Sequence, residues 1–206
     1  MNKVILNKSY HITFLILICI TIIVYIRSLN NKLSKKQTLS LQLAGLVTFI
    51  AAFHYYFMIS TGNTVSYRYL DWLFTTPILL LDLLIILDIY NLKFFINIVI
   101  LNTIMLLFGY LGEKNVISTM SSTILGFIPF ILVFYIIRDR INAKNKNKKP
   151  TETVVDNRIY NVFVVLWALY GINNLVSNFE MKNTSYNILD LLTKGIFALY
   201  IYYRSF

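Results

Sequence analysis

The sequence lacks the residue patterns on which disulfides, metal sites and phosphate-binding loops depend. Cys19 is the single cysteine among 206 residues, so no internal disulfide can form. Neither metal-ligand spacings nor glycine-rich phosphate loops occur along the sequence. Charged residues make up only 14% of the composition. We therefore expect no metal site and no disulfide framework.

The sequence is rich in apolar residues. They form 57% of the chain, and the mean hydropathy of +0.65 is too high for a soluble domain of this length. Seven stretches are long enough to cross a hydrocarbon core of about 30 Å. We therefore predict an integral, multi-pass, all-α membrane protein, with one seven-helix bundle domain over residues 1–206. The predicted spans are 9–29, 38–60, 66–90, 93–112, 117–138, 154–178 and 184–204.

Basic residues outnumber acidic ones, and their positions predict how the chain is oriented. The formal net charge is +10, but the basic residues are grouped by loop and not along one surface, which argues against nucleic-acid binding. Thirteen of them lie in or beside the loops that connect spans one and two, three and four, and five and six, or at the C-terminus, whereas four lie on the other side. This positive-inside bias predicts an outside N-terminus and a cytoplasmic C-terminus. The four outer residues are Lys3, Lys8, Lys114 and Lys182.

The segment Asn142–Pro150, with the sequence NAKNKNKKP, is the one stretch of low complexity. We interpret it as a solvated cytoplasmic linker between the fifth and sixth spans. A binding site for anionic lipid or for a partner protein is the less favoured alternative.

Lys194 is an amine in the middle of the last apolar stretch. A lysine at the centre of a bilayer costs roughly 3 kcal/mol, so such a residue indicates a functional site with a nearby partner. Asp190 precedes it by four residues, a spacing that puts both side chains on one helix face. A silent ion pair is the structural alternative.

The third span carries a line of polar residues. Arg68, Asp71, Thr75 and Asp82 are separated by helical spacings, so they share one face. Asp71 and Asp82 are roughly 16 Å apart along a helix axis. Two positive and two negative groups would balance if this helix met the one that bears Lys194. Asp82 has leucines around it in sequence, and we expect burial to keep it protonated.

The motifs themselves resemble those of the microbial (type 1) rhodopsins. The third-helix signature of that family is similar to Arg68–Asp82, with the sequence RYLDWLFTTPILLLD. Its retinal-lysine segment is similar to Leu189–Phe197, LDLLTKGIF, and its pocket motif is similar to Trp167–Tyr170, WALY. Ala44–Phe57 and Phe108–Glu113 resemble the proteorhodopsin branch. The compact loops and the composition rich in Asn, Ile and Lys also resemble the viral rhodopsins.

This resemblance implies a chromophore and roles for the charged residues. Lys194 would carry all-trans-retinal as a protonated Schiff base. Asp71 would be the primary counterion and proton acceptor, and Asp190 the second counterion. Arg68 would gate the outward path, and Asp82 would be the internal proton donor.

Neighbouring polar residues would support the counterions by the same resemblance. His54 would bond Asp71 and adjust its proton affinity, as the corresponding histidine does in proteorhodopsins. Thr75 would fix Asp71, and Tyr170 would bond Asp190.

The resemblance also implies a retinal pocket. Trp72 and Trp167 would line the polyene, and Leu79 falls at the colour-tuning position with an implication of green absorption. Asn174 occupies a position beside the retinal ring that is normally aromatic. Thr193, just before the lysine, is similar to sensory rhodopsins and implies bluer absorption.

The order of these groups across the membrane predicts the direction of transport. With an outside N-terminus, Asp71 lies toward the exterior and Asp82 toward the cytoplasm. By resemblance, light would move the Schiff-base proton to Asp71, and Asp82 would then replace it. We therefore predict a light-driven outward proton pump and not an enzyme.

Other functions and partners stay open at this point. A light-gated ion channel or a photosensor comes second, because Thr193 resembles the sensors, and a pigment-free membrane protein such as a transporter comes third. We expect membrane lipid around the chain and, by resemblance, a pentameric or trimeric homo-oligomer. A sensor would also need a cytoplasmic signalling partner.

Overall fold

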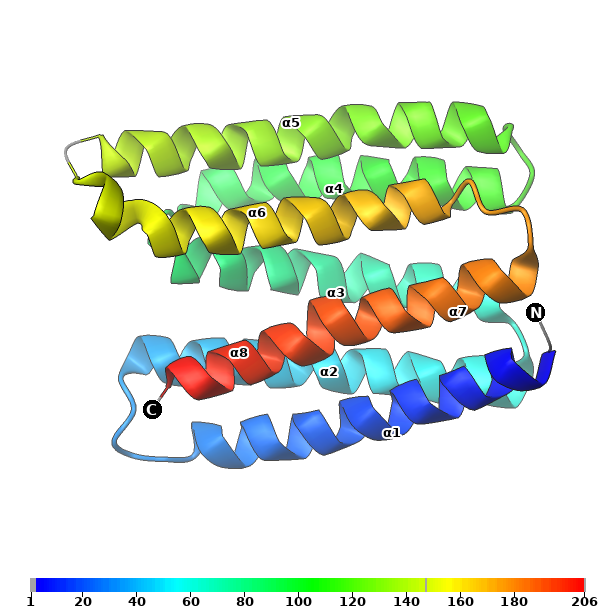
Figure 1. Cartoon of the computed structure of the whole chain (residues 1–206), viewed down its shortest axis with the longest axis horizontal. Coiled ribbons are helices and arrows are strands. Elements are labelled where there is room, and N and C mark those ends of the chain that lie inside the picture. Colours follow the sequence, from blue (N-terminus) through cyan, green and yellow to red (C-terminus); the bar gives the residue numbers. More distant parts are fainter. Residues whose placement is uncertain (1–2, 147, 206) are drawn as a thin grey trace. The chain divides into compact units, whose positions relative to one another are not determined.

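Every element in the structure is a helix (Figure 1). The computed structural model describes residues 3–146 and 148–205, and no strand occurs among them. The predicted all-α fold with seven membrane helices is confirmed, and the last helix contains a π-helical section, η1. The elements are α1 (Lys3–Ser28), α2 (Lys35–Thr61), α3 (Thr64–Ile86), α4 (Leu92–Glu113), α5 (Thr119–Asn145), α6 (Pro150–Asn173), α7 (Phe179–Asp190), η1 (Leu191–Ile196) and α8 (Phe197–Arg204).

Length and composition alone mark α1 to α5 as able to cross a membrane. The two remaining predicted spans are more polar or are interrupted. Asp156 and Arg158 lie near the start of α6. The seventh span is divided into α7, η1 and α8, so none of its sections reaches the length of a membrane span.

Some helix ends differ from the predicted spans. The third span was expected to continue to residue 90, but α3 ends at Ile86. Asp88 has a φ of 53°, and the amide of Ile89 donates to the carbonyl of Leu84 at 3.0 Å, a 6→1 bond that terminates the helix. The fifth helix instead continues past residue 138 to Asn145, and the sixth ends at Asn173 and not at 178.

Local capping explains where α2 begins and ends. The Ser34 side chain accepts a hydrogen bond from the Gln37 amide, and the Gln37 side chain accepts one from the Ser34 amide, which together form a capping box. At the other end, Gly62 has a φ of 69° and donates its amide hydrogen to the carbonyl of Met58. Glycine adopts this left-handed conformation without steric cost.

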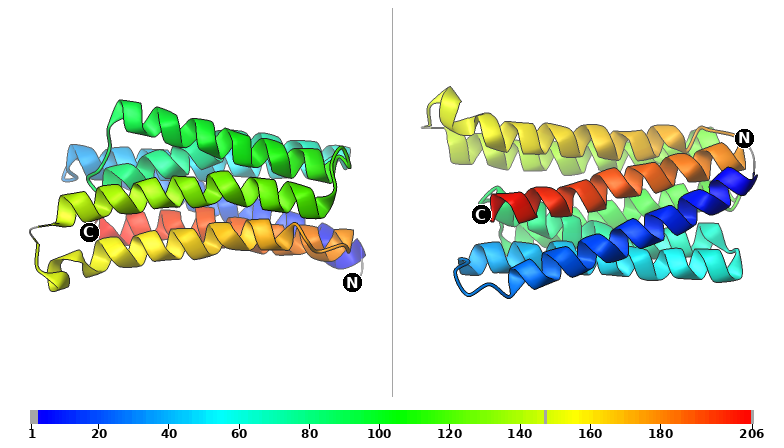
Figure 2. Two further views of the ribbon diagram at one scale, coloured as in Figure 1. Left: turned by 90° about the horizontal axis from the view of Figure 1, so that it is seen from above. Right: turned by 60° about the horizontal axis from the view of Figure 1, so that its bottom comes forward.

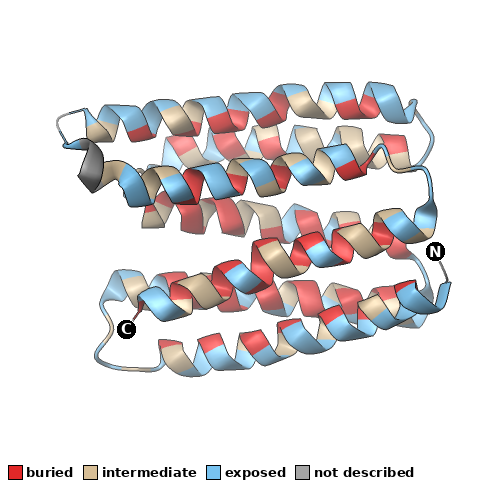
Figure 3. Ribbon diagram, viewed as in Figure 1, coloured by how far each residue is buried: buried red, intermediate tan, exposed pale blue. Residues whose placement is uncertain are grey.

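The described chain forms two compact units. The first contains the residues up to Asp82 and those from Val176 onward. In it α1 packs against α2, and α1 also runs beside the last helix in Figure 1 and in the right-hand view of Figure 2. Buried positions are dense where α7 joins η1 (Figure 3). One apolar core cluster of this unit comprises Leu6, Tyr10, Leu17, Ala51, Ala52, Tyr55 and Met58.

The second unit, from Leu83 to Leu175, contains α4, α5 and α6. Gly112 lets α4 approach α5 closely, because a Cβ added there would lie 2.1 Å from the hydroxyl oxygen of Ser122. An aromatic contact joins α5 to α6, since the rings of Phe134 and Trp167 are 5.7 Å apart and nearly perpendicular. Packing in this unit therefore relies on small residues and on aromatic rings.

Candidate functional site

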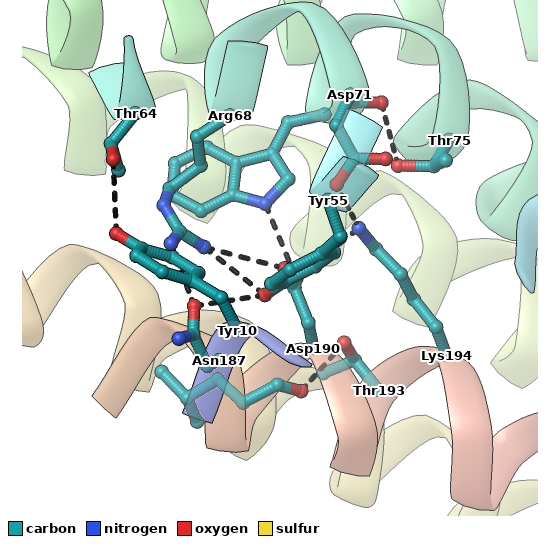
Figure 4. A network of polar contacts seen from close by, with 12 residues as sticks. Tyr10, Tyr55, Thr64, Arg68, Asp71, Thr75, Asn187, Asp190, Thr193 and Lys194 are labelled. Atoms are coloured by element: carbon teal, nitrogen blue, oxygen red, sulfur yellow. Dashed lines mark hydrogen bonds and ion pairs between the residues drawn. The ribbon is translucent and has the colours of Figure 1, made fainter. Parts of the chain in front are cut away.

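Lys194 is enclosed by two carboxylates in the first unit (Figure 4). Its Nζ donates to Oδ2 of Asp71, and it lies 3.2 Å from Oδ1 of Asp190. The exposed fractions of the three side chains are 1%, 0% and 0%, in that order. The structure thus brings together the amine and both of its predicted partners. Such a buried charge is tolerated only when it is paired.

The backbone around Lys194 is π-helical, which is rare and is found mostly at functional sites. Thr193 and Lys194 are both buried in η1, and the Thr193 hydroxyl donates to the carbonyl of Leu189 at 2.8 Å. Gly195 allows η1 to approach α1, because an added Cβ would lie 3.1 Å from Ile20. The segment that carries the amine is therefore packed closely against the first helix.

Arg68 is the second buried cation of the site, with 2% of its surface exposed. Its Nη2 donates to Oδ1 of Asn187 at 2.7 Å, whereas its Nη1 is 3.5 Å from Oδ2 of Asp190. Three aromatic rings surround its guanidinium at 5.3 to 5.9 Å from the ring centroids, within the range of cation–π interactions. These rings belong to Tyr55, Trp72 and Tyr186.

Asp190 receives hydrogen bonds on both carboxylate oxygens. The Tyr55 hydroxyl donates to Oδ2 at 2.8 Å, and the Trp72 indole nitrogen donates to Oδ1 at 3.3 Å. The Tyr55 hydroxyl, on α2 of the first unit, is a partner that the resemblance had not named, and the expected hydrogen bond from Tyr170 stays a prediction. Hydrogen bonds to an ionised carboxylate stabilise the charged form.

Asp71 has fewer partners than Asp190. Its Oδ1 is buried and accepts no hydrogen bond within the described part of the chain. The Thr75 hydroxyl donates to the main-chain carbonyl of Asp71 at 2.8 Å, so Thr75 holds the backbone and not the carboxylate. Asp71 thus depends on Lys194 for its one hydrogen bond from a side chain.

The predicted hydrogen bond between His54 and Asp71 is not formed. His54 donates from Nδ1 to the carbonyl of Ile50 at 2.9 Å, which is one turn earlier on the same helix and therefore within easy reach. Its ring stacks on Phe74 at 6.4 Å between centroids.

Asp82 lies apart from this cluster, with 1% of its surface exposed. The Ser40 hydroxyl of α2 donates to its Oδ1, and Ser40 is itself buried. Its Oδ2 has no hydrogen-bond partner among the residues that the structure describes. The structure therefore contains a second, separate buried carboxyl group on α3.

The arrangement of a buried lysine and two aspartates can be compared with known proteins. Residues 6–205 match the family described as bacteriorhodopsin-like protein. The chain belongs to this family. It is 27% identical over 190 residues to the green-light absorbing proteorhodopsin of Gamma-proteobacterium EBAC31A08, covering 84% of this chain and 76% of the relative. It is 29% identical over 196 residues, with the same coverage, to the blue-light absorbing proteorhodopsin of Gamma-proteobacterium Hot 75m4.

Solved structures agree with this assignment. The crystal structure of viral rhodopsin OLPVRII superposes with a TM-score of 0.83 at 29% sequence identity, covering 98% of this chain and 99% of the other. The predicted resemblance to microbial rhodopsins is thus confirmed, together with the multi-pass membrane location.

Three predicted pocket residues of this rhodopsin lie in the second unit. Trp167 is 7% exposed and packs against Phe134. Tyr170 is on the same helix, α6. Asn174 follows the end of α6 and donates from its amide to the hydroxyls of Ser122 and Thr123 at 3.2 and 2.9 Å. The Asn174 side chain is therefore bonded to α5.

Sequence reasoning did not single out Asn187, Tyr55 and Ser40, which contribute to the rhodopsin site. Asn187 had a signal, because it precedes Asp190 by three residues and so shares its helix face. Tyr55 and Ser40 had no such signal, since their partners are on other helices.

Proposed function

We propose that the chain binds retinal through Lys194 and works as a light-driven outward proton pump. The observation that carries this proposal is the burial of the Lys194 amine between Asp71 and Asp190, with a third buried carboxyl group, Asp82, farther along α3. A pump needs an acceptor and a donor on different sides of one proton-binding nitrogen. This chain has candidates for both.

The residues around Lys194 fit a covalently attached retinal. The amine is buried and is already compensated by carboxylates, so a cationic nitrogen at that position would stay balanced. Trp72 and Leu79, on α3 of the same unit, are buried apolar residues. Trp167 and Tyr170 of α6 are the other candidate pocket residues, and they rest on the family resemblance. When bound, retinal supplies the absorption of visible light and a light-dependent change in the proton affinity of the attached nitrogen.

Hydrogen bonding distinguishes the roles of the two aspartates. Asp190 has donors on both oxygens and a guanidinium nearby, so it stays ionised as a fixed counter-charge. Asp71 has a carboxylate oxygen without a donor. Asp71 is therefore the group that accepts a proton at its carboxylate.

Asp82 holds the proton that would return to the Lys194 nitrogen after that nitrogen has given its own proton to Asp71. Ser40 donates to one of its oxygens, and the other oxygen is left to carry the proton. The positive-inside bias of the loops predicts that Asp82 lies toward the cytoplasm, which would make the net movement of protons outward.

Light-induced acidification tests this function. Cells that express the protein and are supplied with all-trans-retinal should acidify an unbuffered medium under illumination, and a protonophore should abolish the signal. Under voltage clamp, the photocurrent should keep its sign across voltages. A current that reverses would identify a channel, and coloured protein without any transport would identify a photosensor.

Asp82→Asn should slow the recovery of the pigment after a flash by about 100-fold, because general acids contribute roughly that factor to proton transfer. Its colour should be unchanged, since Asp82 does not contact Lys194. Ser40→Ala should give a smaller delay, because the carboxyl group remains. Flash photolysis measures both rates, and an unaltered recovery in Asp82→Asn would exclude Asp82 as donor.

A further inference from the structure

The buried side chain of Asn187, on α7, bonds to three other helices, and Figure 4 shows it beside Arg68 and Tyr55. Its Oδ1 accepts from Arg68 on α3 at 2.7 Å and from the Tyr55 hydroxyl on α2 at 3.0 Å. Its Nδ2 donates to the hydroxyl of Ser9 on α1 at 2.7 Å. Only 1% of Asn187 is exposed. The amide on α7 thus has its own anchor on α1.

Arg68 lies closer to a neutral amide than to an ionised carboxylate, although charge alone would favour the carboxylate. Hydrogen bonds between a guanidinium and a carboxylate are typically about 2.7–2.9 Å long. Here the guanidinium lies at 2.7 Å from the neutral amide of Asn187 and at 3.5 Å from the ionised Asp190. An amide oxygen that is fixed by Ser9 therefore holds the cation away from its counter-charge.

We propose that Asn187 is a positioning residue, which holds Arg68 off Asp190 and so sets how strongly the carboxylate pair attracts protons. This inference rests on the proposed function. The groups facing Asp71 are Lys194, Asp190 and His54. Those facing Arg68 are Asp190 and the three tyrosines Tyr10, Tyr55 and Tyr186. Among these groups, Arg68 is the cation whose position depends on Asn187.

Two substitutions at Asn187 should act in opposite directions. In Asn187→Leu, Arg68 loses its nearest acceptor and closes on Asp190, which neutralises that charge and lowers the proton affinity of Asp71. In Asn187→Asp, the new carboxylate adds a negative charge beside Arg68, so the proton affinity of Asp71 rises. We expect changes of about tenfold in affinity, or about one pH unit, with opposite sign.

The measurement is a titration of the visible spectrum of the retinal-loaded protein from acid to alkali. The midpoint of the colour change should fall in Asn187→Leu and rise in Asn187→Asp. Asn183→Leu is a matched control, because Asn183 is also a buried asparagine on α7 but donates to the carbonyl of Phe179 on its own helix. Its midpoint should equal that of the wild type.

An unchanged or raised midpoint in Asn187→Leu overturns the proposal, and so does an equal shift in Asn183→Leu. Should Asn187→Leu form no pigment, Ser9→Ala takes its place, because it removes the anchor of the amide; an unchanged midpoint there overturns the proposal as well. A wild-type protein that stays colourless with retinal would refute the proposed function instead. If the wild type is coloured and pumps protons but the midpoints of the Asn187 variants do not move, only the role of Asn187 is refuted.

Discussion

We expect Lys194→Ala to stay colourless in all-trans-retinal and to lose light-driven transport. Among the residues that the structure describes, Lys194 is the amine that lies between Asp71 and Asp190, so its removal takes away the proposed attachment point for retinal. Its loss also leaves two buried aspartates with Arg68 as their remaining cation. Removing one partner of a buried ion pair costs about 3–5 kcal/mol, so the variant is expected to unfold at a lower temperature.

Visible absorption after incubation with retinal measures the first effect, and mass spectrometry after borohydride reduction locates the attached group. Lys182→Ala is the matched control, because Lys182 is on the same helix but outside the cluster around Asp71. It should colour like the wild type. Equal colour in Lys194→Ala would refute the proposed attachment site.

Asp71→Asn should bind retinal but move no protons. The amide cannot accept the proton that leaves the attached nitrogen, and Asp190 cannot substitute for it because both of its oxygens already have donors. Light-induced acidification is expected to fall to the level of retinal-free cells. Two buried cations would also face a single carboxylate, again at a cost of about 3–5 kcal/mol.

The assay compares initial rates of acidification at equal amounts of pigment. Asp139→Asn is the control, because Asp139 is an exposed carboxylate on α5. It should pump at the wild-type rate. Residual outward pumping in Asp71→Asn would assign the acceptor role to Asp190.

Local rules made part of the site predictable. Helical spacing placed Asp190 beside Lys194, and the need to balance buried charge brought Asp71 and Arg68 to the same cluster. These arguments use only the period of a helix and the cost of an unpaired ion. The number of helices followed in the same way from the length of apolar stretches.

Contacts between helices could not be predicted from spacing. Tyr55 and Ser40 bond to aspartates on other helices, and one residue pattern fits many such pairings. His54 and Thr75 were expected to contact the carboxylate of Asp71. Each instead donates to a main-chain carbonyl one turn earlier on its own helix, and spacing alone does not distinguish these two outcomes. The early end of α3 depends on a left-handed Asp88, which sequence seldom reveals.

The π-helical section has a consequence for how the last helix tolerates change. A π-helical turn contains more residues than an α-helical turn, so η1 rotates the side chains of α8 about the helix axis relative to those of α7. The residues that face inward on α8 therefore do not continue the α-helical spacing of those on α7. Ala198 and Ile201 face inward only because the chain between Leu191 and Ile196 has its present number of residues. Removing a single residue from this section would rotate both out of the interior, whereas a conservative replacement would not. In evolution, the length of this section should therefore be constrained more tightly than its chemistry.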